Sequence, residues 1–227
     1  MSKQSGSATR TRSKSRKGGR FALDPYFAGL VFAGMGLGTL SLGASPRLVI
    51  LWSTLLGLWL AYREGQSIKV HYQFVDVGRG IGIGLILGLP LLLLAFRVLT
   101  TAIPILYVSV DDPSISGVGG TTIFVSLVLL APLAESLFFH DIVQKERGFW
   151  IAAVLYAVAC VILFLPTAGR YPVVLAAVSG VSAILGGVYG LLYDRFDMTT
   201  SLACHSTVNL LLLFVPALLS HLDLFTR

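Results

Sequence analysis

The sequence has little charge and almost no cysteine. Charged residues make up 12% of its 227 residues, against about 25% in an average soluble domain. Apolar residues make up 55%, and the mean hydropathy is +0.82. Such a composition excludes an ordinary soluble domain and indicates an integral membrane protein. The two cysteines, Cys160 and Cys204, lie inside apolar runs, so we expect small packing residues and not a disulfide.

Acidic residues are missing from the N-terminus. The first 20 residues contain seven lysines and arginines and no aspartate or glutamate. A segment rich in Ser, Gly and Arg cannot form a core, so residues 1–22 are interpreted as a disordered basic tail on the cytoplasmic side, ahead of a transmembrane bundle over 23–227. The tail's simplest role is to set the topology, and anionic lipid is the alternative partner. Nucleic-acid binding is not expected, because the rest of the chain is nearly neutral.

Seven apolar stretches approach or reach the length of about 20 residues that a bilayer requires. They predict an all-α fold, a polytopic bundle of about seven transmembrane helices in contact with membrane lipid, with a tight helical hairpin near Ala44 to Pro46. With the N-terminus inside, the inner segments carry 13 of the 17 lysines and arginines, and the outer segments carry three. This bias follows the positive-inside rule, and we expect a bacterial cytoplasmic membrane. The predicted spans are 26–44, 46–62, 79–101, 122–142, 149–165, 172–193 and 199–219.

Glycines recur at four-residue spacing on several of these spans. Such faces let helix backbones approach closely in lipid, so we expect them to pack on other helices, of this chain or of a partner protein. Gly84 in particular should lie against another helix. No strand precedes the run from Gly80 to Gly84, so it is not a dinucleotide loop, and with no P-loop or paired-cysteine motif we expect neither a cofactor nor a metal. The spaced glycines are Gly34 and Gly38; Gly80, Gly84 and Gly88; and Gly186 and Gly190.

Few strongly polar residues lie inside the predicted spans. Each is a functional candidate, because a polar group in lipid is costly. The fourth span carries Glu135, Ser136 and His140, and the seventh carries His205 and Asn209. His205 and Asn209 share one helix face, whereas Glu135 and His140 do not. On the predicted topology, Glu135 and His205 lie at one level, about 10 Å from the cytoplasmic end.

Two interpretations of the shared depth of Glu135 and His205 are open. In the first, Glu135 is protonated or hydrogen-bonded to His205 and joins two helices. In the second, Glu135 is a general base acting on a water, with His205 and Asn209 directed at a developing oxyanion. Pro132, one turn before Glu135, can kink the helix and admit water. Spacing alone favours the structural interpretation.

The segment over about residues 120–215 resembles the CPBP family of intramembrane proteases, named for CAAX-processing and bacteriocin-processing members. The family pattern is E-E-x-x-x-R, then F-x-x-x-H, then H-x-x-x-N. Ala131-Pro132 to Asp141 is similar to the context of the first motif, and His205 to Asn209 matches the third. The resemblance implies a glutamate-dependent endopeptidase in which Glu135 is the base, and His205 and Asn209 stabilise the oxyanion.

The chain departs from the family pattern at three points. Ser136 takes the place of the second glutamate, and His140 takes the place of the arginine. No histidine lies between His140 and His205, so the middle motif has no imidazole. The residues that could stand in its place, depending on the alignment, are Cys160, Phe164 and Ala168.

These departures define the expected function. We predict a CPBP-like membrane protein with an incomplete site and weak or absent peptidase activity. Its candidate catalytic residues are Glu135, His205, Asn209 and His140. The alternative is a non-catalytic accessory or structural subunit of a larger membrane complex, joined through its glycine-rich helix faces.

Overall fold

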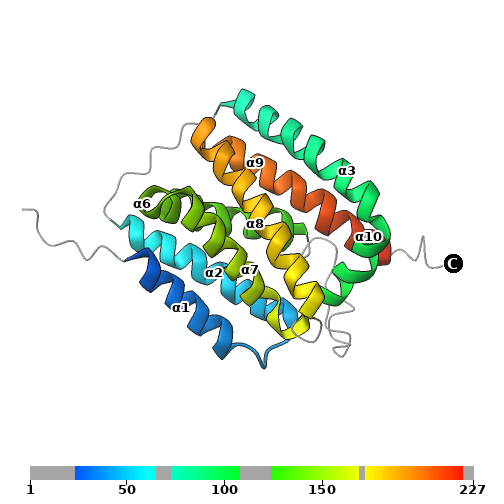
Figure 1. The fold of residues 1–227 in the computed structure, drawn as a ribbon, viewed down its shortest axis with the longest axis horizontal. Helices are drawn as coiled ribbons and strands as arrows, with labels where there is room; N and C mark the ends of the chain where they lie inside the picture. Colours follow the sequence, from blue (N-terminus) through cyan, green and yellow to red (C-terminus); the bar gives the residue numbers. More distant parts are fainter. Residues whose placement is uncertain (1–23, 65–72, 108–123, 169–171, 222–227) are drawn as a thin grey trace, which may run out of the picture.

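The structure, a computed structural model, describes residues 24–64, 73–107, 124–168 and 172–221. These residues are almost entirely helical and contain no strand (Figure 1). The predicted all-α fold class is therefore confirmed. The predicted tail over residues 1–22 lies outside the described residues.

Seven helical rods follow one another along the described ranges, at the positions that the apolar stretches predict. The first three are α1 (Pro25–Gly38), α2 (Ala44–Arg63) and α3 (Phe74–Tyr107). The fourth, here called the central helix, runs without a break through η2 (Val125–Leu130), α5 (Ala131–Glu135), η3 (Ser136–Gln144) and α6 (Lys145–Arg147). Next come α7 (Phe149–Ala168) and α8 (Pro172–Arg195). The C-terminal helix consists of α9 (Met198–Asn209), η4 (Leu210–Phe214) and α10 (Val215–His221).

Five of the described helices are long and apolar enough to cross a membrane. These are α3, the central helix, α7, α8 and the C-terminal helix. The helix α1 is apolar but has 14 residues, a length of about 21 Å against a hydrocarbon core of about 30 Å. The helix α2 has 20 residues. By helix length and composition, the chain is an integral membrane protein with several spans.

The first helix ends earlier than the sequence predicted. The predicted span was 26–44, but α1 ends at Gly38, and residues 39–43 turn the chain into α2. The hydroxyl of Thr39 donates to the Met35 carbonyl at 2.7 Å and so satisfies a carbonyl of the last helical turn. The hairpin itself is present, but its predicted position near Ala44 to Pro46 was wrong. Pro46 lies in the first turn of α2, where a missing N–H is tolerated.

Two π-helical segments each end two residues before a proline. The segment η2 precedes Pro132, and η4 precedes Pro216. A proline offers no N–H to the carbonyl four residues earlier, and its ring clashes with that carbonyl. The wider turn relieves this conflict, because the bond that closes each segment reaches a carbonyl five residues back. Glu135 lies about one helical turn after the first of these segments, at the end of α5, and π-helical turns are frequent at functional sites.

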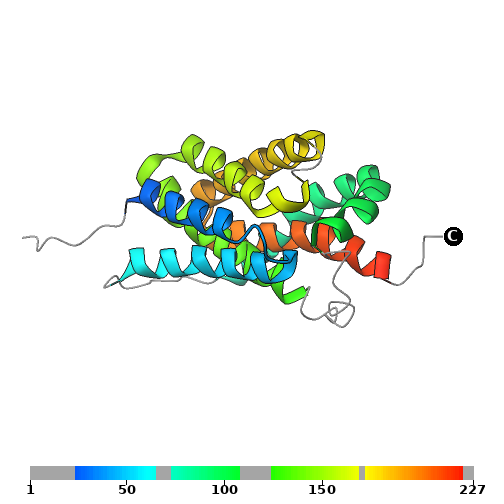
Figure 2. The same cartoon turned by 90° about the horizontal axis from the view of Figure 1, so that it is seen from below.

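The central helix is the most enclosed of the candidate spans. Of its apolar window 67% is buried, against 11% for α3. It lies between α2 on one side and α9 on the other (Figure 1), while α2 and α8 form opposite sides of the molecule (Figure 2). The polar side chains of this helix between Glu135 and Gln144 are therefore surrounded by protein and not by lipid.

The glycine face of α3 packs against α9. A Cβ atom added at Gly84 would lie 2.7 Å from the Cβ atom of Thr207 and 3.0 Å from the carbonyl oxygen of Cys204. Gly80 and Gly88 meet the same C-terminal helix. The prediction that Gly84 lies against another helix is confirmed.

Of the remaining spaced glycines, those of α8 are closely packed and Gly34 and Gly38 of α1 are not. A Cβ atom at Gly186 would collide with the Tyr156 ring, and one at Gly190 would lie 2.7 Å from Oε1 of Gln144. Around Gly34 and Gly38 of α1, by contrast, no described atom lies within 4 Å of an added Cβ. Close helix packing therefore uses the spaced glycines of α3 and α8 and leaves Gly34 and Gly38 of α1 open.

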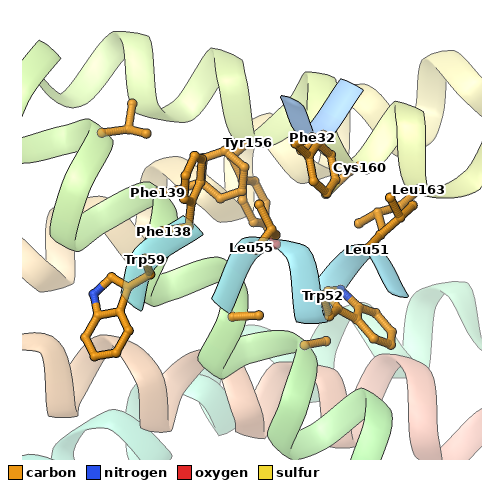
Figure 3. Packing of buried hydrophobic residues seen from close by; sticks show 14 of the residues in the cluster. Phe32, Leu51, Trp52, Leu55, Trp59, Phe138, Phe139, Tyr156, Cys160 and Leu163 are labelled. Carbon is orange, nitrogen blue, oxygen red and sulfur yellow. The ribbon is translucent and has the colours of Figure 1, made fainter. Parts of the chain in front are cut away.

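An aromatic cluster fills the space between α2, the central helix and α7. Figure 3 shows Phe138 and Phe139 of the central helix against Tyr156 of α7, with Trp52 and Trp59 from α2 nearby. The rings of Phe139 and Tyr156 meet edge to face at 5.4 Å. Both cysteines are buried and free, as predicted. This aromatic cluster lies along one side of the polar residues around Glu135.

Candidate functional site

Glu135 ends α5, and its side chain is buried among three helices. The indole N–H of Trp52 donates to Oε1 at 2.8 Å, and the hydroxyl of Tyr156 donates to Oε2 at 2.9 Å. Trp52 comes from α2 and Tyr156 from α7. A buried carboxylate without such partners would be strongly unfavourable. The two bonds therefore explain how Glu135 is accommodated at 6% exposure.

His205 of α9 joins the same cluster. Its Nε2 lies 3.5 Å from Oε2 of Glu135 and 3.4 Å from the hydroxyl oxygen of Tyr156. Its Nδ1 lies 3.2 Å from Oγ of Ser136. The ring of Tyr189 stacks on the imidazole with centroids 4.1 Å apart. The predicted approach of Glu135 to His205 is confirmed. We call Trp52, Glu135, Ser136, Tyr156 and His205 the Glu135 cluster.

The hydrogen-bond partners assign the proton on His205. The hydroxyl hydrogen of Tyr156 is directed at Glu135, so the oxygen of Tyr156 is an acceptor toward Nε2. The hydroxyl of Ser136 can donate to Nδ1. The neutral tautomer with its proton on Nε2 satisfies both contacts. Two donors, from Trp52 and Tyr156, then converge on Glu135, and the Nε2–H of His205 lies 3.5 Å from Oε2 beside its contact with Tyr156. This arrangement suits an ionised carboxylate because that group only accepts.

Asn209 lies one turn further along the C-terminal helix but does not join the Glu135 cluster. Its amide nitrogen donates to the carbonyl of Leu127 at 2.9 Å. Leu127 belongs to η2, where the backbone winds as a π-helix. The bond to Leu127 uses one of the two N–H donors of the amide, and within the described residues no hydrogen bond joins Asn209 to His205. Its catalytic role stays a prediction.

His140 points toward α8 and not toward Glu135. Its Nδ1 lies 2.9 Å from Oε1 of Gln144, whose amide nitrogen donates to the Gly190 carbonyl at 3.0 Å. The oxygen of Gln144 thus faces His140, so Nδ1 carries the proton. The ring also stacks on Tyr193 with centroids 6.2 Å apart. His140 therefore connects the central helix to α8, and it faces away from Glu135, as the spacing of the two residues predicted.

Asp141 accepts hydrogen bonds from several side chains near the C-terminal end of the central helix. It accepts from the Trp59 indole at 2.9 Å, from Lys145 at 2.7 Å and from the Arg63 guanidinium. The hydroxyl of Tyr193 reaches it at 3.4 Å. These partners come from α2, α6 and α8. Asp141 ties the helix ends together and lies outside the Glu135 cluster.

Sequence reasoning missed the two aromatic donors to Glu135. Trp52 and Tyr156 sit in apolar runs and were not singled out from the sequence. The available signal was chemical, since a buried Trp N–H or Tyr O–H nearly always needs an acceptor. Tyr156 lies one turn before Cys160, one of the residues considered for the middle motif. A phenol thus occupies the α7 position that faces Glu135.

In the ranges that the structure describes, no group of three or more His, Cys, Asp or Glu side chains is arranged to hold a metal ion. Comparison with protein-family models, with curated proteins and with solved structures found no match. The resemblance to the CPBP family therefore rests on the motifs in the sequence.

Proposed function

We propose that the protein is a CPBP-like membrane protein in which the Glu135 cluster is chiefly a polar connection between helices, with weak or absent endopeptidase activity. The observation that carries this proposal is the set of donors on Glu135. Trp52 occupies one carboxylate oxygen, and Tyr156 and His205 approach the other. The two hydrogen bonds use two of about four acceptor positions of a carboxylate, and the imidazole of His205 stands in front of a third at 3.5 Å. Little capacity is left for a water that would have to be deprotonated.

The chemistry of Tyr156 supports the same conclusion. In the family pattern a middle histidine helps to activate the hydrolytic water. Here the neighbour of Glu135 on α7 is a phenol whose proton is donated to Glu135, so it cannot accept a proton from water. Loss of a general-base partner costs about 10²–10⁴ in rate. Ser136 can still orient His205 through Nδ1, so traces of activity are compatible with the proposal.

The test compares cleavage and stability in the same preparations. Purified full-length chain in liposomes is incubated with a mixture of membrane-anchored peptides, and Glu135→Gln serves as the variant. We expect wild type to cleave no faster than Glu135→Gln, while Glu135→Gln unfolds at a lower temperature. Efficient cleavage that Glu135→Gln abolishes without a change in unfolding temperature would establish a catalytic glutamate and overturn the proposal.

The open glycines of α1 favour a second candidate function. Gly34 and Gly38 have no described neighbour within 4 Å of an added Cβ, unlike Gly84. A small-residue face in lipid gains from close packing on a helix, which suits an accessory subunit of a larger membrane complex. Gly38→Leu should then abolish co-purification of a partner from a mild-detergent extract, whereas Gly57→Leu on α2, equally open, should preserve it. Equal recovery with both variants would contradict this candidate.

The proposed topology has seven spans and a cytoplasmic N-terminus. The bias of lysine and arginine supports it. So does the parallel course of α1 and α7, since Asp24 bonds to Arg147 at one end and Gly36 meets Ile162 at the other. Three intervening spans would require this shared direction. Reporter fusions should place the N-terminus inside and the C-terminus outside; a cytoplasmic C-terminus would contradict seven spans.

A further inference from the structure

An apolar groove of about 340 Å³ runs between α1 and α7. Its lining extends from Tyr26 to Ala33 on α1 and from Leu155 to Ile162 on α7, and the buried rings of Phe138 and Phe139 form its floor. Within each stretch the lining residues recur at three- and four-residue spacing, so one face of each helix contributes. Seven residues of helix extend about 10 Å. The groove therefore covers roughly a third of the hydrocarbon core of about 30 Å.

The groove exists because α1 and α7 diverge. At its closed end a Cβ atom on Gly36 would lie only 2.2 Å from Cγ2 of Ile162, so the helices touch there. Nearer the N-terminal ends, Gly29 lines the groove with no described atom within 4 Å of an added Cβ. The lining residues Leu30 and Val158 are 71% and 47% exposed. In a membrane protein this opening faces acyl chains and not water.

A cation lies at the open end. The guanidinium carbon of Arg147 sits 4.6 Å over the ring of Tyr26, which itself lines the groove. Arg147 also bonds to Asp24 at 2.7 Å, with both side chains partly exposed to their surroundings. Such an exposed ion pair is weak, so a stronger anion can compete for the arginine. An apolar groove that ends at a cation is complementary to a lipid with an anionic headgroup.

We propose that this groove binds one acyl chain of a membrane phospholipid whose anionic headgroup contacts Arg147. The lining supplies the apolar contact that a methylene chain requires, and it offers a polar ligand little in return. A basic residue at the membrane surface favours a net negative headgroup over a zwitterionic one by about five-fold. The inference does not depend on whether the Glu135 cluster is catalytic.

Native mass spectrometry of the purified full chain tests the proposal. The protein is equilibrated with equal amounts of dioleoylphosphatidylglycerol and dioleoylphosphatidylcholine, and the lipids retained per chain are counted. We expect wild type to retain one phosphatidylglycerol with about five-fold preference. Gly29→Leu, which fills the groove, should lose it, whereas Gly57→Leu, on an open face of α2, should not. Ala33→Phe provides a second groove-filling variant should Gly29→Leu fail to fold.

The headgroup contact has its own matched control. Arg79 bonds to Asp76 at 2.8 Å and lies 4.7 Å over the Phe196 ring, an arrangement like that of Arg147 but away from the groove. Arg147→Gln should remove the preference for phosphatidylglycerol, and Arg79→Gln should leave it unchanged.

Three outcomes would overturn the proposal. The first is equal lipid retention by wild type and by both groove-filling variants. The second is an undiminished preference for phosphatidylglycerol in Arg147→Gln. The third is a polypeptide, such as a second copy of the chain, that is retained in place of lipid and lost on Gly29→Leu, because the groove would then be a protein interface.

Discussion

Arg47 donates a hydrogen bond of 2.6 Å to the carbonyl of Ile162. That carbonyl lies four residues before Pro166, a proline inside α7, so no backbone N–H of α7 can reach it. The same guanidinium also bonds to the carbonyls of Leu163 and Gly36. Arg47 is only 1% exposed. It therefore completes the backbone hydrogen bonding where α1 and α7 meet.

The first prediction concerns this arginine. Arg47→Met keeps most of the side-chain volume but removes every donor, so buried carbonyls lose their partners at about 1–3 kcal/mol each. We expect a clear fall in the temperature of unfolding, measured on detergent-purified protein. Arg79→Met, which removes an exposed arginine, should change it little. Equal shifts for the two variants would mean that the bonds of Arg47 contribute nothing specific.

The second prediction concerns the donors on Glu135. Glu135→Gln places an amide N–H against one of the groups that now donate to the carboxylate, and we expect a loss of about 1–3 kcal/mol in unfolding free energy. Adding Tyr156→Phe should cost less in this background than in wild type, because it removes a conflicting donor. A double-mutant cycle by thermal unfolding measures that coupling. Additive effects would show that Tyr156 and Glu135 do not interact.

The third prediction concerns Asn209 and distinguishes a structural role of this residue from a role in stabilising an oxyanion. Asn209→Ala leaves the Leu127 carbonyl without its donor, so we expect a loss of about 1 kcal/mol in stability. Asn209→Asp should be at least as harmful, since a carboxylate cannot donate to a carbonyl. Chemical unfolding of both variants provides the measurement. Unchanged stability combined with lost peptidase activity would instead favour the oxyanion role.

The fourth prediction concerns the packing of α3. Gly84→Leu inserts a side chain where the Thr207 Cβ atom lies 2.7 Å away from an added Cβ, and overpacking of this kind costs about 1–3 kcal/mol. Gly82→Leu, on the same helix with no described atom within 4 Å, should be tolerated. We expect a lower yield and a lower unfolding temperature for Gly84→Leu alone. Similar behaviour of the two variants would rule out a specific contact at Gly84.

The sequence predicted the helices well because lipid leaves the backbone few alternatives. It failed at the end of α1, where residues 39–43 carry no charge and continue the apolar stretch yet form a turn. Matched depth correctly brought Glu135 and His205 together, since depth depends only on helix rise and topology. The direction of Asn209 could not be predicted in the same way. It depends on the π-helical winding of η2, which periodicity based on a regular α-helix does not contain.

Trp52 and Tyr156 illustrate a different limit. Each has a large apolar ring and one polar group, and their hydrogen bonds to Glu135 emerge only when three helices are packed. A search restricted to strongly polar residues overlooks these two of the five members of the Glu135 cluster. Pairing each intramembrane carboxylate with the tryptophans and tyrosines predicted at its depth would have identified both as candidates.

The π-helical turns before Pro132 and Pro216 also bear on how relatives of this protein should be compared with it. A wide turn holds one residue more than the regular turn that it replaces, so a chain with a regular helix at that place would be shorter by one position. A gap-free alignment would then be wrong by one position on one side of η2. Glu135 would be matched to a residue that points about 100° away from it around the helix axis. Single-residue gaps belong within 125–130 and 210–214, inside membrane helices where alignments normally forbid them.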